Sequence, residues 1–120
     1  MVIIGAGPGG YEAASVAAAG GVEVTVVEET GIGGAAVLTD CVPSKTLIAT
    51  AEVTSTLRRA AELGLRHTET FEVDLDAVNS RVRQLAQAQS DDISRGLERK
   101  GVRLISGRAR LATGAPGHLH

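Results

Sequence analysis

The feature that most constrains this chain is a glycine-rich turn between a short apolar run and an alanine-rich stretch. The apolar run at residues 1–4 predicts a buried parallel strand, because both faces of such a strand are covered. The alanine-rich stretch at residues 8–19 predicts a helix, and the glycines at positions 20 and 21 are typical of a helix end. Residues 22–27 are mostly β-branched and predict a second strand. This order of elements requires two parallel strands joined by a right-handed crossover.

Inside the turn, Gly5, Gly7 and Gly10 have the spacing G-x-G-x-x-G, and Pro8 and Gly9 occupy the last two variable positions. In a dinucleotide-binding turn the first glycine permits the sharp bend, the second lets the pyrophosphate approach the backbone, and the third lets the helix pack closely on the strand. The N–H groups and the dipole at the start of the helix favour anionic phosphates. We therefore predict that these residues bind a dinucleotide. A glycine-rich turn without a ligand is the weaker alternative, because the strand-to-helix context gives the pattern its meaning.

An acidic residue follows the second predicted strand. Glu28 comes directly after it, and a carboxylate about twenty residues beyond the glycines accepts hydrogen bonds from a ribose 2′-hydroxyl. The same charge would repel a 2′-phosphate, so NADP is a poor ligand at this position. Glu29 is the neighbouring alternative for this role. These features predict binding of an ADP group, which FAD and NAD both contain.

The rest of the sequence predicts two long helices and a third strand. Residues 29–42 predict a loop, and Pro43 is well placed to begin a helix that reaches about residue 63. Asp74 is a good N-cap for a second long helix, which ends near residue 100. A third strand is expected at residues 102–105, and a β segment at residues 108–111. We expect an α/β fold whose parallel sheet holds the nucleotide at its carboxyl edge, with both helices inserted between the second and third strands. The residues expected to face inward from the first of these helices are Leu47, Val53, Leu57 and Ala61.

Composition and charge disfavour several other classes of protein. The chain has 120 residues and a net charge of −2, with acidic and basic residues spread along it, which disfavours nucleic acid or an anionic membrane as the partner. No apolar run is long enough to span a bilayer and no signal peptide precedes the first strand, so we expect a cytoplasmic protein. The single cysteine excludes a disulfide within the chain. The histidines are scattered, so no metal site is predicted.

The segment after the second predicted strand carries a further motif. It reads Gly-Ile-Gly-Gly-Ala-Ala-Val-Leu-Thr-Asp-Cys-Val-Pro-Ser-Lys over residues 31–45. This segment resembles the active-site segment of the flavoprotein disulfide reductase family, which includes dihydrolipoamide dehydrogenase, glutathione reductase and mercuric reductase. In that family two glycines precede a C-x-x-x-x-C pair and a short apolar-Pro-Ser-Lys stretch. The resemblance runs from residue 1 to about residue 111. It implies FAD as the cofactor, NAD(P)H as the co-substrate and a Rossmann-like FAD-binding domain, of which residues 1–120 would be the amino-terminal part.

The chain departs from that family at the first cysteine, whose place is taken by Ala36. A redox disulfide needs two sulfurs within bonding distance, so Cys41 alone cannot form one within the chain. With this departure the segment most resembles an actinobacterial branch, whose members are named after lipoamide dehydrogenase but act as NAD(P)H:quinone or dye reductases. The resemblance implies hydride transfer from NAD(P)H to FAD and then to a small-molecule, quinone-type acceptor, in a longer homodimeric parent. A dihydrolipoamide dehydrogenase relative and a non-catalytic nucleotide-binding remnant are the alternatives.

The same resemblance implies roles for individual residues. Gly33 and Gly34 would let the backbone approach the FAD pyrophosphate and ribityl chain. Cys41 would place its sulfur against the flavin ring; the alternative is a small buried hydrophobe left from an ancestral pair. Lys45 would lie near the flavin N5 edge and stabilise negative charge on the reduced flavin, the alternative being a solvated helix lysine. The backbone of Ala109 would touch the adenine.

Overall fold

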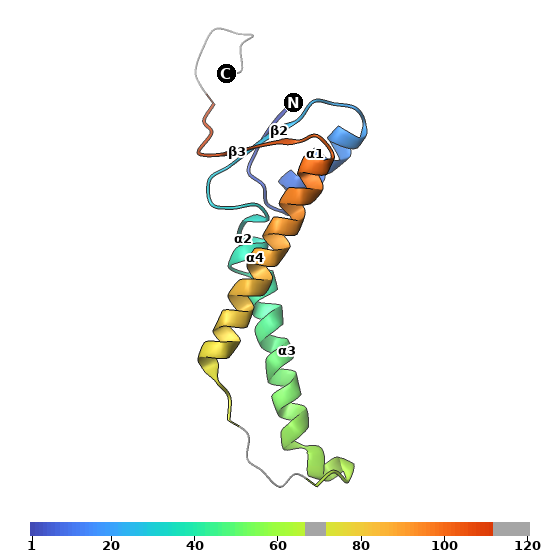
Figure 1. The fold of residues 1–120 in the computed structure, drawn as a ribbon, viewed down its shortest axis with the longest axis vertical. Coiled ribbons are helices and arrows are strands. Elements are labelled where there is room, and N and C mark those ends of the chain that lie inside the picture. The colour runs from blue at the N-terminus through green and yellow to red at the C-terminus, as the bar shows by residue number, and fades with distance from the viewer. Residues whose placement is uncertain (67–71, 112–120) are drawn as a thin grey trace.

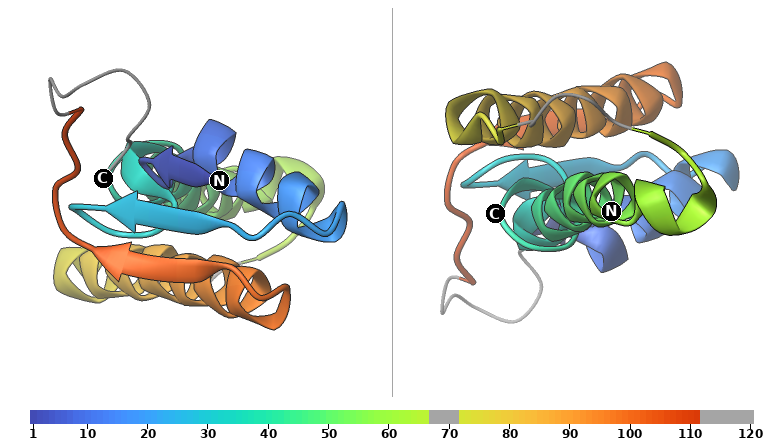
Figure 2. Two further views of the ribbon diagram at one scale, coloured as in Figure 1. Left: turned by 90° about the horizontal axis from the view of Figure 1, so that it is seen from above. Right: turned by 90° about the horizontal axis from the view of Figure 1, so that it is seen from below.

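The computed structural model describes residues 1–66 and 72–111 (Figure 1). Three strands form one parallel sheet in the order β1-β2-β3, with bounds β1 Val2–Ile4, β2 Thr25–Glu28 and β3 Arg103–Ser106. Figure 2 shows the three strands side by side. The predicted parallel α/β arrangement is therefore confirmed. The histidines at positions 67, 118 and 120 lie outside the described residues.

The first strand, helix and second strand lie close to their predicted positions. Helix α1 spans Pro8–Ala19, with Gly7 as its N-cap, Pro8 in its first turn and Gly20 as its C-cap. Strand β2 begins three residues later than position 22, because the chain is still turning there. The N–H of Val22 donates to the carbonyl of Ala17 at 3.1 Å, as part of the turn that closes α1.

The predicted loop at residues 29–42 contains a short helix that the sequence analysis missed. Helix α2 spans Gly34–Leu38, and helix α3 begins at Cys41 rather than at Pro43, ending at Arg58. Gly33 and Gly34 have φ values of 98° and 59°, which turn the chain sharply enough for α2 to start. Pro43 then lies in the first turn of α3, where N–H groups have no partner within the helix.

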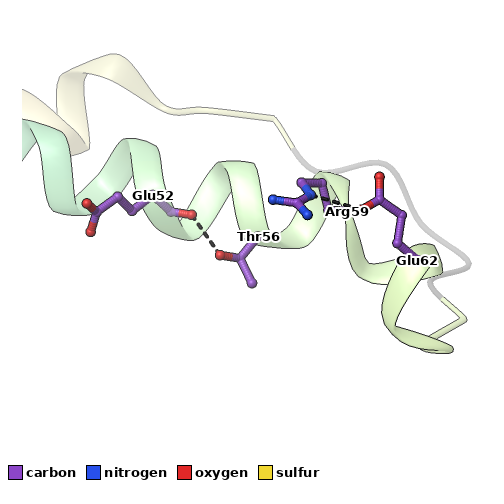
Figure 3. Close-up of polar contacts among 4 residues, drawn as sticks. All are labelled: Glu52, Thr56, Arg59 and Glu62. Atoms are coloured by element: carbon purple, nitrogen blue, oxygen red, sulfur yellow. Dashed lines mark hydrogen bonds and ion pairs between the residues drawn. The ribbon is translucent and has the colours of Figure 1, made fainter.

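The two long helices are inserted between β2 and β3, as predicted. Helix α4 spans Leu75–Arg99, and the N-cap is confirmed: the N–H of Ala77 donates to a carboxylate oxygen of Asp74 at 2.9 Å. Helices α3 and α4 contact each other and extend away from the sheet (Figure 1). A 3-10 helix, η1 (Ala60–Leu63), follows α3, and Arg59 pairs with Glu62 at 2.9 Å (Figure 3). This exposed ion pair stabilises the turn only weakly.

The prediction that four residues of the first long helix face inward is wrong. All of α3 lies in the described part of the chain, and none of its residues is buried. Leu47, Val53 and Leu57 are 51%, 61% and 41% exposed. Ala61 falls beyond α3, in η1, and is also exposed. The reason is geometric, since α4 covers only one side of α3.

The core lies between one face of the sheet and the helices α1 and α4. The apolar residues Val24, Val26, Ala14 and Leu97 are buried there in a single cluster. The opposite face of the sheet is open: Val2 and Ile4 of β1 are 63% and 54% exposed. The expectation that the first strand is covered on both faces is therefore wrong for this chain, although the strand forms.

No strand forms at residues 108–111, so the β segment expected there is wrong as well. The chain turns away after β3 at Gly107, whose N–H donates to the carbonyl of Glu28 at 2.8 Å. This bond ends the pairing of β3 with β2 and brings the next residues over the end of β2. In the described ranges, no helix is both long enough and apolar enough to cross a membrane.

Candidate nucleotide-binding site

The glycine turn lies at the junction between β1 and α1, where the fingerprint places it. Gly5 has φ +91° and donates its N–H to the carbonyl of Val27 at 2.8 Å, so the turn is attached to the end of β2. The first helical bond of α1 runs from the N–H of Tyr11 to the carbonyl of Gly7 at 3.0 Å. The N–H groups before it have no acceptor within the helix. Pro8 and Gly9 are exposed, so this end of α1 is open to an anionic ligand.

Gly10 allows α1 to start directly against the turn. A Cβ added to Gly10 would lie 2.0 Å from the carbonyl oxygen of Gly5, a distance that no side chain can accept. The third glycine of the fingerprint therefore has the steric role predicted for it.

Glu28 connects the end of β2 to the glycine turn. One carboxylate oxygen accepts the N–H of Ala6 at 2.6 Å, and the other accepts the N–H and hydroxyl of Thr30 at 2.8 and 2.9 Å. Glu29 is exposed and instead pairs with Arg108 at 3.8 Å. Of the two candidate acids, Glu28 is the one that faces the turn. Thr30 is a residue that the sequence analysis missed.

These hydrogen bonds keep the Glu28 carboxylate ionised. Partial burial raises its pKa, but the bonds from Ala6, Thr30 and Gly31 outweigh this effect and lower the pKa to about 2, from an ordinary value of 4.5. The site therefore holds a full negative charge at neutral pH, next to amides at the start of α1. A sugar hydroxyl can donate to such a carboxylate.

The low pKa of Glu28 predicts a pH dependence of stability. Because the folded-state pKa lies below the unfolded one, the carboxylate stabilises the fold above pH 4.5, and this contribution is lost as the pH falls towards 2. We expect the free energy of unfolding, measured with urea, to be lower at pH 3 than at pH 6. After allowance for solvent screening, Glu28 should account for about 1–2 kcal/mol of this difference. Glu28→Gln should lose correspondingly less stability over this range. An equal loss of stability between pH 6 and pH 3 in the unaltered chain and in Glu28→Gln would contradict the assignment of the low pKa to Glu28.

An open pocket of about 320 Å³ lies at the carboxyl ends of β1 and β2. Glu28 and Ala109, the two residues predicted to contact the adenosine, both line this pocket. The folding of the chain after Gly107 brings them together, although they are far apart in the sequence. The residues that line this pocket are Ile4, Gly5, Val27, Glu28, Glu29, Thr30, Gly107, Arg108 and Ala109.

The second glycine pair packs directly on the glycine turn. The N–H of Gly33 donates to the carbonyl of Ala6 at 2.8 Å. A Cβ on Gly34 would lie 3.0 Å from the Cα of Gly7, so the two backbones touch at this point. The predicted pyrophosphate residues from both motifs therefore form one continuous surface of backbone.

Cys41 and Lys45 lie at the start of α3. Because α3 begins at Cys41, the two side chains are one helical turn apart on the same face. Cys41 is exposed, so it is not a buried hydrophobe in this structure. Within the described ranges, no hydrogen bond or ion pair joins either residue to the glycine turn. Their roles at the flavin stay predictions.

The other residue that the sequence analysis missed is Ser90 of α4. Its hydroxyl donates to the carbonyl of Ile32 at 2.6 Å, and the residue is buried. A signal was present, because Ser90 interrupts a helical series of apolar positions that includes Ala86, Ile93 and Leu97.

A parallel sheet whose first strand leads through a glycine turn into a helix defines a Rossmann-like nucleotide-binding fold. The sequence profile of the pyridine nucleotide-disulphide oxidoreductase family matches residues 1–117. The chain belongs to this family.

Relatives of known name agree with this assignment. An NAD(P)H dehydrogenase (quinone) of Mycobacterium tuberculosis H37Rv is 49% identical over 98% of this chain and 24% of its own length. A dihydrolipoyl dehydrogenase of Chlamydia muridarum is 36% identical over 92% of this chain and 23% of its own length. The crystal structure of LpdA from Mycobacterium tuberculosis matches with a TM-score of 0.88 at 47% identity, over 98% of this chain and 25% of LpdA. The chain thus spans about a quarter of the length of these relatives.

Proposed function

We propose that this chain binds FAD through its ADP half and contributes the FAD-binding part of a flavin-dependent NAD(P)H oxidoreductase. The observation that carries the proposal is the position of the ionised Glu28 carboxylate. It lies beside the open start of α1 and in the same pocket as Ala109. An ADP group matches this arrangement, because it combines a diphosphate with a ribose that donates hydrogen bonds.

The residues present fit such a ligand. The turn at residues 5–10 supplies the backbone N–H groups of Gly7, Gly9 and Gly10, which carry no side chains of their own, and Gly33 and Gly34 extend the same backbone surface. Glu28 would accept the ribose hydroxyl, and the backbone at Ala109 would contact the adenine. When bound, the flavin would supply hydride acceptance from NAD(P)H and electron transfer to a small-molecule acceptor. Lys45 would place its positive charge near the ring, and Cys41 its sulfur.

A quinone-type acceptor is proposed over a lipoyl disulfide. Ala36 of α2 stands where a dithiol enzyme needs its first cysteine, and Cys41 is the chain's single cysteine. The relative from Mycobacterium tuberculosis that bears the quinone name is also the more similar of the two. Ala36→Cys, made in the proposed longer oxidoreductase, is the discriminating test: lipoamide reduction would support a dihydrolipoamide dehydrogenase ancestry of the whole site.

Flavin content and NADH oxidation of the purified chain test the proposal. We expect FAD to bind and to be recognised by its absorbance and by quenching of its fluorescence. FAD bound without NADH oxidation would support a nucleotide-binding role for this chain alone, and oxidation with a quinone or dye would support the complete reaction. Affinity for NAD without affinity for FAD would contradict the flavin assignment.

A further inference from the structure

We infer that Ser90 of helix α4 is a positioning residue for the flavin site. It holds the peptide group between Ile32 and Gly33 in the orientation that places Gly34 on the glycine turn. This inference rests on the proposed function, because the loop that Ser90 holds is the one proposed to approach the FAD pyrophosphate.

The burial of Ser90 is the first supporting observation. Its side chain is on the inner face of α4, where Leu97 belongs to the core and Ile93 packs against it. In the part of the chain that the structure describes, Ser90 is the only buried residue with a polar side chain, at 6% exposure. A hydroxyl in such surroundings requires a hydrogen-bond partner, because leaving it unpaired is costly.

The direction of the hydroxyl is the second observation. Serine and threonine within helices commonly bond to the carbonyl four residues earlier, as Ser94 does to Ser90 at 2.9 Å. Ser90 instead donates to Ile32, 58 residues away in the sequence, at 2.6 Å. This bond therefore joins α4 to the loop before α2 and is separate from the hydrogen bonds of the helix itself.

The peptide group that accepts this bond is held from both sides. The carbonyl of Ile32 accepts from Ser90, and the N–H of Gly33 in the same planar unit donates to the carbonyl of Ala6 at 2.8 Å. The N–H of Ala6 in turn donates to Glu28 at 2.6 Å. A continuous series of hydrogen bonds thus runs from α4 through the loop and the glycine turn to the proposed ribose acceptor.

Loss of the Ser90 hydroxyl would release one side of this peptide group. Gly33 adopts φ +98°, and glycine can exchange such a conformation for others at little cost, so the peptide could rotate. Rotation would turn the Gly33 N–H away from Ala6 and move Gly34 from its contact with Gly7. The backbone surface proposed for the pyrophosphate would then be broken at its centre.

Ser90→Ala in the 120-residue chain tests the inference, with Ser94→Ala as the matched control on the same helix. We expect Ser90→Ala to weaken FAD binding by about tenfold, the equivalent of one lost hydrogen bond in a buried setting. We also expect hydrogen exchange at the Gly33 amide to accelerate, while the amides of α4 stay protected. Ser94→Ala should change neither. Ser90→Thr keeps a hydroxyl and should restore slow exchange at Gly33.

The possible outcomes separate this inference from the proposed function. If the unaltered chain does not bind FAD, the proposed function fails, and the flavin role of Ser90 fails with it. If the unaltered chain binds FAD and Ser90→Ala binds within twofold with Gly33 still protected, only the role of Ser90 is overturned. Should Ser90→Ala not fold, Ser90→Cys keeps the side-chain volume with a much weaker donor. FAD affinity within twofold in that variant would equally overturn the inference.

Discussion

Gly10→Ala is expected to lower the free energy of unfolding by about 1–3 kcal/mol, the usual cost of forcing extra volume into a packed site. The added Cβ would lie 2.0 Å from the carbonyl oxygen of Gly5. That oxygen belongs to the backbone, so the clash can be relieved only by moving α1 or the turn. The loss is measured by urea unfolding followed by circular dichroism.

Gly9→Ala is the matched control for this effect on stability. Gly9 lies in the same turn of α1, and a Cβ there would meet nothing within 4 Å. Since alanine has a higher helix propensity than glycine, Gly9→Ala should leave the free energy of unfolding unchanged or raise it by about 0.5–1 kcal/mol. Equal destabilisation by both substitutions would show that the steric contact at Gly10 is not the cause.

Glu28→Ala is expected to weaken FAD binding by about 10- to 100-fold, as for the loss of a hydrogen bond to a charged group. The substitution removes the proposed ribose acceptor. It also leaves the N–H groups of Ala6 and Thr30 without the carboxylate that now accepts from them. The dissociation constant is measured by quenching of FAD fluorescence.

Glu29→Ala is the control for charge at this position. Glu29 is the next residue, is exposed, and pairs with the exposed Arg108 at 3.8 Å. We expect its removal to change the FAD dissociation constant by no more than about twofold, since exposed ion pairs contribute little. A larger effect at Glu29 than at Glu28 would mean that the ribose acceptor has been misassigned by one residue.

The sequence was sufficient for those parts of the fold that depend on neighbouring residues. The strand, glycine turn, helix and strand at the start of the chain were predicted because each carries its own local signal, from Gly5 and Pro8 to the glycines after α1. The N-cap at Asp74 was predicted for the same reason. Glu28 could be named as the acid at the end of the second strand, because the spacing from the glycines is a property of the fold itself.

The parts that were wrong or missed depend on contacts between distant residues. A β segment was expected at residues 108–111, but Gly107 bonds to the end of β2 and directs the chain away from the sheet. The apolar positions of α3 have helical periodicity, yet burial requires a neighbouring element, and among the described residues none buries them. Ser90 stands out as a polar residue in an apolar helical series, but its partner, the carbonyl of Ile32, became evident only once α4 was seen against that loop.

The most direct test of the central claim is the effect of ADP on the amide resonances of the isotopically labelled chain. If the ADP half of FAD binds where proposed, ADP should shift the amide resonances of Gly5, Gly7, Gly9 and Gly10 and those of residues 28–31. These shifts should reach a plateau as the ADP concentration is raised. Shifts confined to residues of α3 and α4, or saturable binding of FMN with none of ADP, would contradict the account.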